Sequence, residues 1–395
     1  MAYSFLRRSV RSVAATDYET TSSRTLKQSG TGAADSFNLS FPLKLLRGHQ
    51  PSVVEPSPRH DSSGNEGVSV RPNVNKSSIA QASSLKQLNV KTTTQTRRMY
   101  YRKRTTKVNP YKHRVLLGPT QLCDDDTEMV ILVHSATRNI AQRAAIRETW
   151  GNATLTGRWP NNQQNGSCAG LRLAFVLGLH VDEAENRAVR EEHARYNDIV
   201  QRDFLDHYHN MTLKSLLDLK VVDDRCPRVR YLLKTDDDMV VNLPYLLRLL
   251  ANKKLQWSIM GPVNVAARVH RAGKWKLTQD EFPFSYFPPY ESGSAYVITG
   301  DLIHELFVTA EYVPHIFVDD VYVTGILGRI LGVNHVKHSG FAFWHSKPPS
   351  LCDIVRDRVV AGTKMTPTML RNMWKQLPKA ECPVSIHHFT KWLVV

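Results

Sequence analysis

The chain has 395 residues, of which 42% are hydrophobic, enough for one large domain or two modest ones. Its formal net charge is +16, but residues 1–122 carry 20 Lys and Arg against 6 Asp and Glu, so most of the excess lies there. The rest is close to neutral, which argues against a nucleic-acid-binding body, and no run of about 20 apolar residues is present to span a membrane.

The first 120 residues are rich in Ser, Thr, Asn and Gln and show no sustained hydrophobic periodicity. Near their end, Lys91–Lys107 interleaves basic and aromatic residues, a pattern that is compatible with nucleic-acid binding. A disordered, solvated stem is the favoured interpretation, because runs of like charge usually accompany disorder. We therefore expect a basic arm at residues 1–120, one folded domain at residues 121–395, and no nucleic-acid partner.

Beyond the arm, apolar β-branched runs alternate with segments rich in helix formers. The predicted strands are residues 129–135, 171–178 and 229–235, and the predicted helices are residues 136–152, 183–198, 213–224 and 242–253. This alternation is typical of a mostly parallel sheet flanked by helices, so the predicted fold class is α/β. After residue 255 the pattern gives way to aromatic- and proline-rich loops, interrupted by a helix at residues 301–311. We expect an irregular second half.

Three consecutive carboxylates, Asp236, Asp237 and Asp238, directly follow the apolar run Tyr231–Leu233. In α/β sheets, ligands bind outside the carboxyl ends of the strands, where this turn is predicted to lie. Adjacent like charges are costly to desolvate, so a positive partner is expected. Because side chains alternate in extended chain, Asp236 and Asp238 are expected to converge on a Mg²⁺ or Mn²⁺ ion that also holds phosphate oxygens. The alternative is a solvent-exposed acidic turn.

The phosphate-binding loops GxxxxGK[ST] and GxGxxG are both absent from the sequence. The first predicted helix instead carries Arg143 and Arg147, four residues apart and therefore on one helical face. Their guanidinium groups are candidate contacts for a nucleotide diphosphate. An exposed helix face explains the spacing equally well.

A second acidic pair, Asp319-Asp320, lies between apolar residues. A carboxylate close to a bound diphosphate can remove the proton from an attacking hydroxyl group. The alternative is an N-cap for the following helix. His345 is a candidate ligand in the tail segment FAFWHS, although a lone histidine is more often structural.

The five cysteines are scattered, without CxxC or zinc-type spacing. They fit either buried thiols or one or two disulfides with one cysteine left over. Three N-glycosylation sequons, at Asn152, Asn165 and Asn210, are weak evidence for the secretory route. The N-terminus lacks the apolar core of a signal peptide, so the sequence by itself predicts a soluble chain that is not exported by a standard signal.

Four segments resemble, in order, the motif series of the β-1,3-galactosyltransferase family, which includes β-1,3-N-acetylglucosaminyltransferases and is related to the fringe proteins. They are RAAIRETWGN (Arg143–Asn152), LLKTDDDMVVN (Leu232–Asn242), PPYESGSAYVITGDL (Pro288–Leu302) and FVDDVYVTGIL (Phe317–Leu327). The resemblance covers roughly residues 128–346. It implies a GT-A nucleotide-sugar-binding fold with an acceptor-binding second half, and residues 121–395 as the glycosyltransferase catalytic domain.

The resemblance also implies roles for single residues. Asp238 is similar to the family's metal ligand, and His345 to the late histidine that completes the metal site. Asp236 and Asp237 are similar to residues that contact the nucleotide, and Asp320 to the general base. Three places depart from the family pattern: Asp319 stands where many members have Glu, Glu291 where vertebrate members often have Cys, and Ser294-Ala295 in place of a more Gly-rich turn. The departures leave the implied reaction unchanged but affect the disulfide pattern and the sugar specificity.

The expected activity is inverting transfer of galactose, or of an N-acetylhexosamine, from a UDP-sugar in β-1,3 linkage to a protein or lipid glycan. The resemblance implies Mn²⁺ or Mg²⁺ as cofactor and a type II protein of the Golgi membrane, whereas this sequence contains no transmembrane segment. The rival hypothesis is a nucleotide-sugar- or carbohydrate-binding module without turnover. The presence of both Asp320 and His345 argues against that rival.

Overall fold

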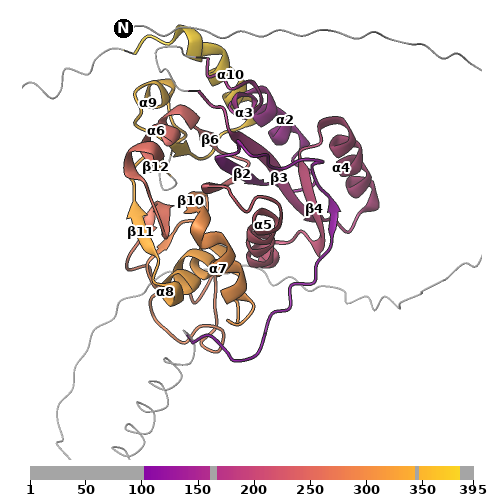
Figure 1. Cartoon of the computed structure of the whole chain (residues 1–395), viewed down its shortest axis with the longest axis vertical. Coiled ribbons are helices and arrows are strands. Elements are labelled where there is room, and N and C mark those ends of the chain that lie inside the picture. Colours follow the sequence, from indigo (N-terminus) through magenta and orange to yellow (C-terminus); the bar gives the residue numbers. More distant parts are fainter. Residues whose placement is uncertain (1–101, 161–166, 343–346, 383–395) are drawn as a thin grey trace, which may run out of the picture. The chain divides into compact units, whose positions relative to one another are not determined.

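The computed structural model describes residues 102–160, 167–342 and 347–382. A mixed eight-stranded sheet forms the centre of the fold (Figure 1). Across the sheet the strands are β1 (Val115–Leu117), β4 (Ile199–Leu205), β3 (Leu171–Leu179), β2 (Met129–His134), β5 (Tyr231–Asp236), β10 (Ala295–Thr299), β7 (Ser258–Gly261) and β11 (Asn334–Lys337). The run β4-β3-β2-β5 is parallel, whereas β10 is antiparallel to both of its neighbours. The predicted α/β fold with a mostly parallel sheet is confirmed.

Helices cover both faces of this sheet, because successive buried side chains of each strand point to opposite faces. Met129, Ile131 and Val133 of β2 pack into one apolar core, and Val130 and Leu132 into the other. The helices are α2 (Ile140–Glu148), α3 (Asn152–Thr156), α4 (Glu183–Tyr196), α5 (Met211–Arg225), α6 (Leu243–Lys253), α7 (Gly300–Ala310), α8 (Gly328–Leu331), α9 (Leu351–Val355) and α10 (Pro367–Gln376). Both cores are therefore continuous with the two faces of one sheet.

Two differences from the predicted elements have local causes. The helix that was expected from residue 136 begins at Ile140, because the carbonyls of Ala136 and Thr137 accept hydrogen bonds from the Arg143 side chain. Strand β4 was not predicted at all. Its sequence hides the usual apolar alternation, because Gln201 and Arg202 are buried within it.

The second half is irregular, as expected, but it contributes strands to the sheet. β10 inserts between β5 and β7, and short pairs form outside the main sheet: β8 (Val263–Asn264) with β9 (Tyr290–Glu291), and β13 (Ala361–Gly362) with both β6 (Val240–Val241) and β12 (Phe341–Ala342). Two 3₁₀ turns, η1 (Tyr208–Asn210) and η3 (Leu377–Lys379), and a π-helical segment, η2 (Val321–Leu327), complete the elements. Segments of π-helix frequently occur at functional sites.

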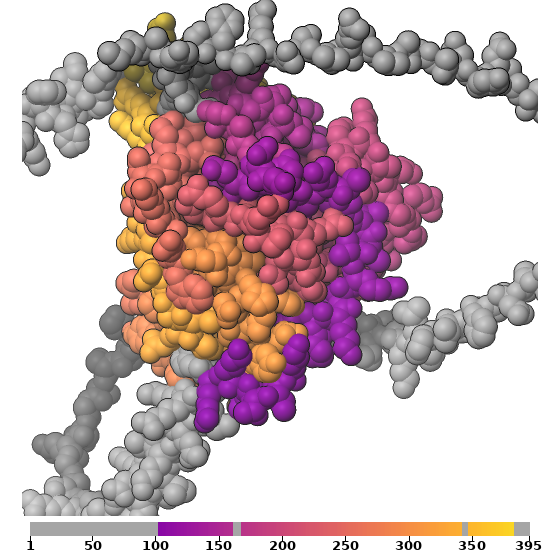
Figure 2. Space-filling model, in the orientation of Figure 1, coloured from indigo at the N-terminus to yellow at the C-terminus, as the bar shows by residue number. Residues whose placement is uncertain are grey.

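Part of the chain that was assigned to the arm packs on the body. The Asn109 amide donates to the carbonyls of Ala310 at 2.9 Å and Val313 at 2.6 Å, and β1 pairs with β4. In Figure 2 this indigo segment lies against the orange surface that includes α7. The folded body thus makes contacts with residues upstream of residue 121.

Two disulfides, Cys123–Cys226 and Cys352–Cys382, leave Cys168 as a buried thiol. The first joins the loop before β2 to the end of α5, and the second joins the first turn of α9 to residue 382, beyond η3. Of the two alternatives that the sequence left open, the structure therefore has the one with disulfides, and one cysteine is left over. Among the described residues, no helix combines the length and the apolar character that a membrane crossing requires.

Candidate active site

The acidic turn after β5 begins with an ion pair. Asp236 ends the strand, and its Oδ1 accepts a hydrogen bond from the Lys234 Nζ at 2.7 Å. Burial raises the pKa of the Asp236 carboxyl to about 6, although the Lys234 ammonium opposes that rise. A positive partner was required on electrostatic grounds, and part of it is a lysine two residues earlier in the same strand.

Asp237 and Asp238 contact other segments, because the chain turns after Asp236 and the strand alternation ends there. The Asp237 Oδ2 accepts hydrogen bonds from Ser135 Oγ at 2.6 Å and from Asn139 Nδ2 at 2.8 Å, both in the loop between β2 and α2. The Asp238 Oδ2 accepts one from Thr363 Oγ1 at 3.1 Å. The three carboxylates of the turn therefore have separate protein partners, and the convergence of Asp236 and Asp238 on a metal ion stays a prediction.

Asp319 and Asp320 precede η2, and their side chains diverge. The Asp319 Oδ2 accepts a hydrogen bond from the Ser215 Oγ of α5 at 2.8 Å. The Asp320 carboxylate accepts two amide hydrogen bonds, from Val321 at 2.8 Å and from Gly293 at 2.9 Å. The bond to Val321 is an N-terminal cap of η2, so the capping alternative is correct as a description of local structure. The capping bond is compatible with a second role, because Asp320 also lies in the wall of a cavity.

The pKa of the Asp320 carboxyl is raised to about 7, above its ordinary value of 3.8. Burial is the main cause, and the adjacent negative charge of Asp319 adds to it. The amide donors and the Lys234 ammonium pull in the other direction without cancelling the rise. A carboxylate with such a pKa is suited to accept a proton near neutral pH.

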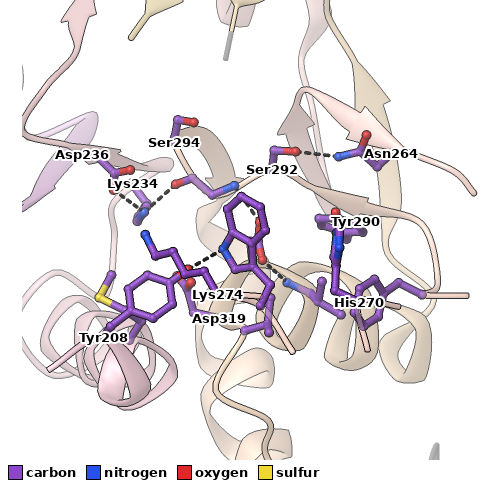
Figure 3. Close-up of a pocket in the computed structure, with 17 residues that line it drawn as sticks. Tyr208, Lys234, Asp236, Asn264, His270, Lys274, Tyr290, Ser292, Ser294 and Asp319 are labelled. Carbon is purple, nitrogen blue, oxygen red and sulfur yellow. Dashed lines mark hydrogen bonds and ion pairs between the residues drawn. The ribbon is translucent and has the colours of Figure 1, made fainter. Parts of the chain in front are cut away.

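Asp236 of the acidic turn and both members of the second pair, Asp319 and Asp320, line one cavity of about 560 Å³ (Figure 3). Lys234 and Asp236 lie at the β5 side of this cavity, and Asp319 and Asp320 lie at the start of η2. Lys234 Nζ also donates to the Gly293 carbonyl, and the Gly293 amide donates to Asp320. A continuous path of hydrogen bonds therefore connects the two groups, in a cavity whose size is typical of small-molecule sites.

Arg143 and Arg147 do not line this cavity. The fully buried Arg143 donates to both carboxylate oxygens of Glu192, at 2.9 and 2.5 Å. Arg147 pairs with Glu192 at 2.7 Å and with Asp198 at 2.7 and 2.9 Å. α4 and the residues that follow it thus supply the anions for this face of α2. The geometry gives no support to a direct contact with a diphosphate, and the exposed-face alternative does not hold for Arg143.

Arg143 has an indirect connection to the acidic turn. Its guanidinium also donates to Ser135 Oγ at 3.0 Å and to the carbonyls of Ala136 and Thr137. Ser135 in turn donates to Asp237. Arg143 therefore holds the loop after β2 in the conformation that contacts the acidic turn.

The donor chemistry of the acidic turn fits a hard divalent cation. In their contacts with described residues, Asp236 and Asp238 each use a single carboxylate oxygen, which leaves one oxygen of each for an ion. Across the described part of the chain, no three His, Cys, Asp or Glu side chains gather into a group that could hold a metal. His345, the second expected ligand, lies outside the described residues.

Several residues of the cavity were not identified from the sequence. Tyr208 precedes α5, and His270, Lys274 and Trp275 come from the irregular segment between β8 and β9. The only signal in the sequence was the basic and aromatic composition of RVHRAGKWK. Composition alone could not place this segment against β5 and η2.

Comparison with known proteins places the chain among sugar-transferring enzymes. The family model described as galactosyltransferase matches residues 141–339. β-1,3-Galactosyltransferase 1 of Mus musculus is 30% identical over 279 residues, which are 69% of this chain and 81% of the relative. β-1,3-Galactosyltransferase 5 of Pan troglodytes is 35% identical over 206 residues, 51% of this chain and 66% of the relative. A solved structure, the galactosyltransferase LgtC in complex with donor and acceptor sugar analogues, has a TM-score of 0.33 at 11% identity and covers 65% of this chain and 98% of that chain.

Proposed function

Because this chain belongs to the galactosyltransferase family, we propose that it transfers galactose or an N-acetylhexosamine from a UDP-sugar, in β-1,3 linkage, to a glycan acceptor. The chain is a hexosyltransferase. The observation that carries the finer proposal is Asp320, an amide-anchored carboxylate with a raised pKa in the wall of a sugar-sized cavity. No observation favours the alternative of a binding module without turnover.

In the proposed reaction Asp320 is the general base. Its carboxylate takes the proton of the acceptor's 3-hydroxyl group while the hydroxyl oxygen bonds to the anomeric carbon of the donor sugar. The bond from that carbon to UDP breaks, and UDP leaves with the electron pair, so the anomeric configuration inverts. The amides of Val321 and Gly293 fix the carboxylate in one orientation, so little reorganisation is needed when the proton moves.

We assign the nucleotide to the acidic turn. Asp236 and Asp237 would contact it, and Asp238, together with His345, would hold a Mn²⁺ or Mg²⁺ ion. When bound, such an ion neutralises part of the charge that develops on the departing diphosphate. Arg143 acts one step further away, as a positioning residue for the loop that contacts Asp237. Its ion pair with Glu192 gives a reason for its burial that does not involve the nucleotide.

We further propose that the enzyme acts on glycoprotein or glycolipid glycans in the Golgi apparatus, attached to the membrane. The two disulfides support an oxidising compartment, since such bonds are rare in the cytosol. The sequon residues Asn152 and Asn210 are partly exposed, at the first residue of α3 and immediately before α5, whereas Asn165 lies outside the described residues.

The test is UDP release by the purified chain with UDP-galactose, UDP-N-acetylglucosamine and UDP-N-acetylgalactosamine, each with glycan acceptors and with or without Mn²⁺. Asp320→Asn should lower turnover by about 10²–10⁴-fold, the usual contribution of a general base, and leave UDP binding unchanged. Asp319→Asn is the matched control. It should lower turnover less, because the Asp319 side chain is directed to Ser215 and not to the acceptor hydroxyl. Normal turnover of folded Asp320→Asn, with only a lowered thermal midpoint, would reduce Asp320 to a helix cap. Failure of every donor would refute the activity.

A further inference from the structure

A long loop delivers side chains to the cavity from one side. The pocket hairpin, which we define as residues 265–287, connects β8 to β9. An isolated bridge between Arg268 and Tyr286 pairs its two arms. The Arg271 guanidinium donates to four backbone carbonyls inside the hairpin, those of Leu277, Thr278, Phe282 and Phe284. Phe282 and Phe287 anchor the hairpin in the core, so its position on the cavity is defined.

The hairpin places Lys274, an exposed residue that lines the cavity, over an aromatic shelf. The Lys274 ammonium lies 4.1 Å from the centroid of the Tyr208 ring and 6.0 Å from that of Trp275. Trp275 Nε1 donates to the Tyr208 hydroxyl, which fixes the two rings relative to each other. Figure 3 shows the Lys274 side chain reaching inward, toward Lys234 and Asp236. A cation held over two rings loses less freedom when it binds a ligand than a solvated lysine does.

The other charges of the cavity already have partners. Lys234 is engaged by Asp236 and the Gly293 carbonyl. Asp319 is engaged by Ser215, and Asp320 by two amides. Lys274 makes no hydrogen bond or ion pair with any residue that the structure describes, although three carboxylates line the same cavity. With ionised Asp236, Asp319 and Asp320 against Lys234 and Lys274, the lining is net negative when His270 is neutral, so an anion that enters when Asp320 is ready to accept a proton needs an available cation.

We propose that Lys274 is an anion-binding residue of the substrate site, which contacts either the diphosphate of the donor or an acidic group on the acceptor glycan. The inference rests on the proposed function, because it assumes that both substrates meet in this cavity. Between the two sources, the structure favours the diphosphate. The Lys274 side chain reaches toward the acidic turn, where the nucleotide is assigned, and an ammonium group binds phosphate as a point charge.

The test compares Lys274→Met with two controls. Lys276→Met removes a charge from the same hairpin, at an exposed residue that does not line the cavity. Lys274→Arg keeps the charge and should retain most of the binding. UDP affinity is measured by calorimetry, which needs no turnover. The KM for the acceptor is measured with a neutral acceptor and with one that ends in glucuronic acid, and thermal midpoints confirm that all variants fold.

If Lys274 binds the diphosphate, Lys274→Met weakens UDP binding about tenfold, the lower end for a hydrogen bond to a charged group at a solvent-accessible position, and Lys276→Met does not. If it binds an acidic acceptor, UDP affinity stays constant and the KM rises only for the glucuronic-acid acceptor. Unchanged values in both arms overturn the proposal. That result would leave the transferase activity standing, because UDP release by the wild-type chain is measured separately.

Discussion

Two groups of adjacent carboxylates contribute to one cavity: Asp236 from the acidic turn, and Asp319 and Asp320 from the pair before η2. The fold treats the two groups differently. The acidic turn after β5 distributes its three side chains among separate partners: a lysine, a hydroxyl and amide pair, and a threonine. In the pair before η2, no cation of the described residues is in direct contact with Asp320, which is held by two backbone amides. Under the proposed function, the first group would bind a charged ligand and the second would accept a proton. Neighbouring acidic residues can serve different chemistry because their partners come from different segments.

The largest effect is expected from the acidic turn itself. Asp238→Asn should abolish activity and weaken Mn²⁺-dependent UDP binding, because one hard anionic ligand for the ion is lost. Binding of UDP by calorimetry, with and without Mn²⁺, is the measurement. Mn²⁺-dependent binding at wild-type strength in the variant would contradict the assignment. Asp320→Asn, whose binding should be intact, is the matched control that separates the two acidic groups.

Lys234 tests whether the two groups are independent, because it contacts Asp236 and, through Gly293, supports Asp320. Lys234→Met should lower the free energy of unfolding by about 1–3 kcal/mol, since it leaves a carboxylate and a carbonyl without their donor. Turnover of the folded protein should fall as well. The control is Lys220→Met, at a partly exposed lysine paired with Asp224, which should change stability by about 0.5 kcal/mol or less. Equal stability of the two variants would show that Lys234 does not connect the groups.

The pH profile of turnover should report the base. Protonated Asp320 cannot accept a proton, so kcat/KM should fall as pH drops through about 7, by about tenfold per pH unit below it. The charged or titratable groups around it in the cavity are Asp319, Lys234, Asp236, Tyr208, Tyr290, His270 and Lys274. Asp319→Asn should move this acid limb to lower pH, because the charge of Asp319 is one cause of the raised pKa. A limb that does not move in Asp319→Asn would assign the titration to another group.

The raised pKa of Asp320 affects stability in the direction opposite to turnover, because stability should increase as pH drops. The folded state binds the Asp320 proton more tightly than the unfolded chain does, because its pKa is raised from 3.8 to about 7. This carboxyl therefore stabilises the substrate-free protein fully below about pH 4, and its contribution is lost as pH rises through about 7. In Asp320→Asn this component should disappear from the pH dependence of the thermal midpoint.

The smallest effect on turnover is expected from Ser215, the hydrogen-bond donor to Asp319. Ser215→Ala removes the hydroxyl that donates to Asp319 Oδ2, a loss of about 0.5–1.5 kcal/mol of stability. Turnover should change by only a few-fold, because Asp320 keeps both of its amide donors. Thermal unfolding and UDP release on the same preparation check both numbers. A loss of turnover as large as that of Asp320→Asn would mean that the position of Asp319 matters as much for the reaction as the Asp320 carboxylate does.

Much of the fold followed from local patterns in the sequence. β2, β3 and β5 are apolar runs bounded by polar turns, and α4 and α6 have recognisable caps: Asp182 accepts from the Ala184 amide, and Asn242 from the Tyr245 amide. Strand β4 was not predicted, because two of its buried residues are polar. The place of the antiparallel strand β10 in the sheet was not predicted, because nothing local in its sequence specifies which strands it joins.

The sequence by itself determined which residues are candidates for chemistry: the acidic turn at the end of a buried strand, and the second acidic pair before a helical segment. Both were visible because consecutive carboxylates next to apolar runs require compensation. Only the tertiary structure decided the partners. Glu192 engages Arg143 and Arg147, and the pocket hairpin brings Lys274 to the cavity, through contacts between segments far apart in the chain. Charge compensation acts through space, so the sequence shows that a partner is needed, whereas packing of the elements selects which one.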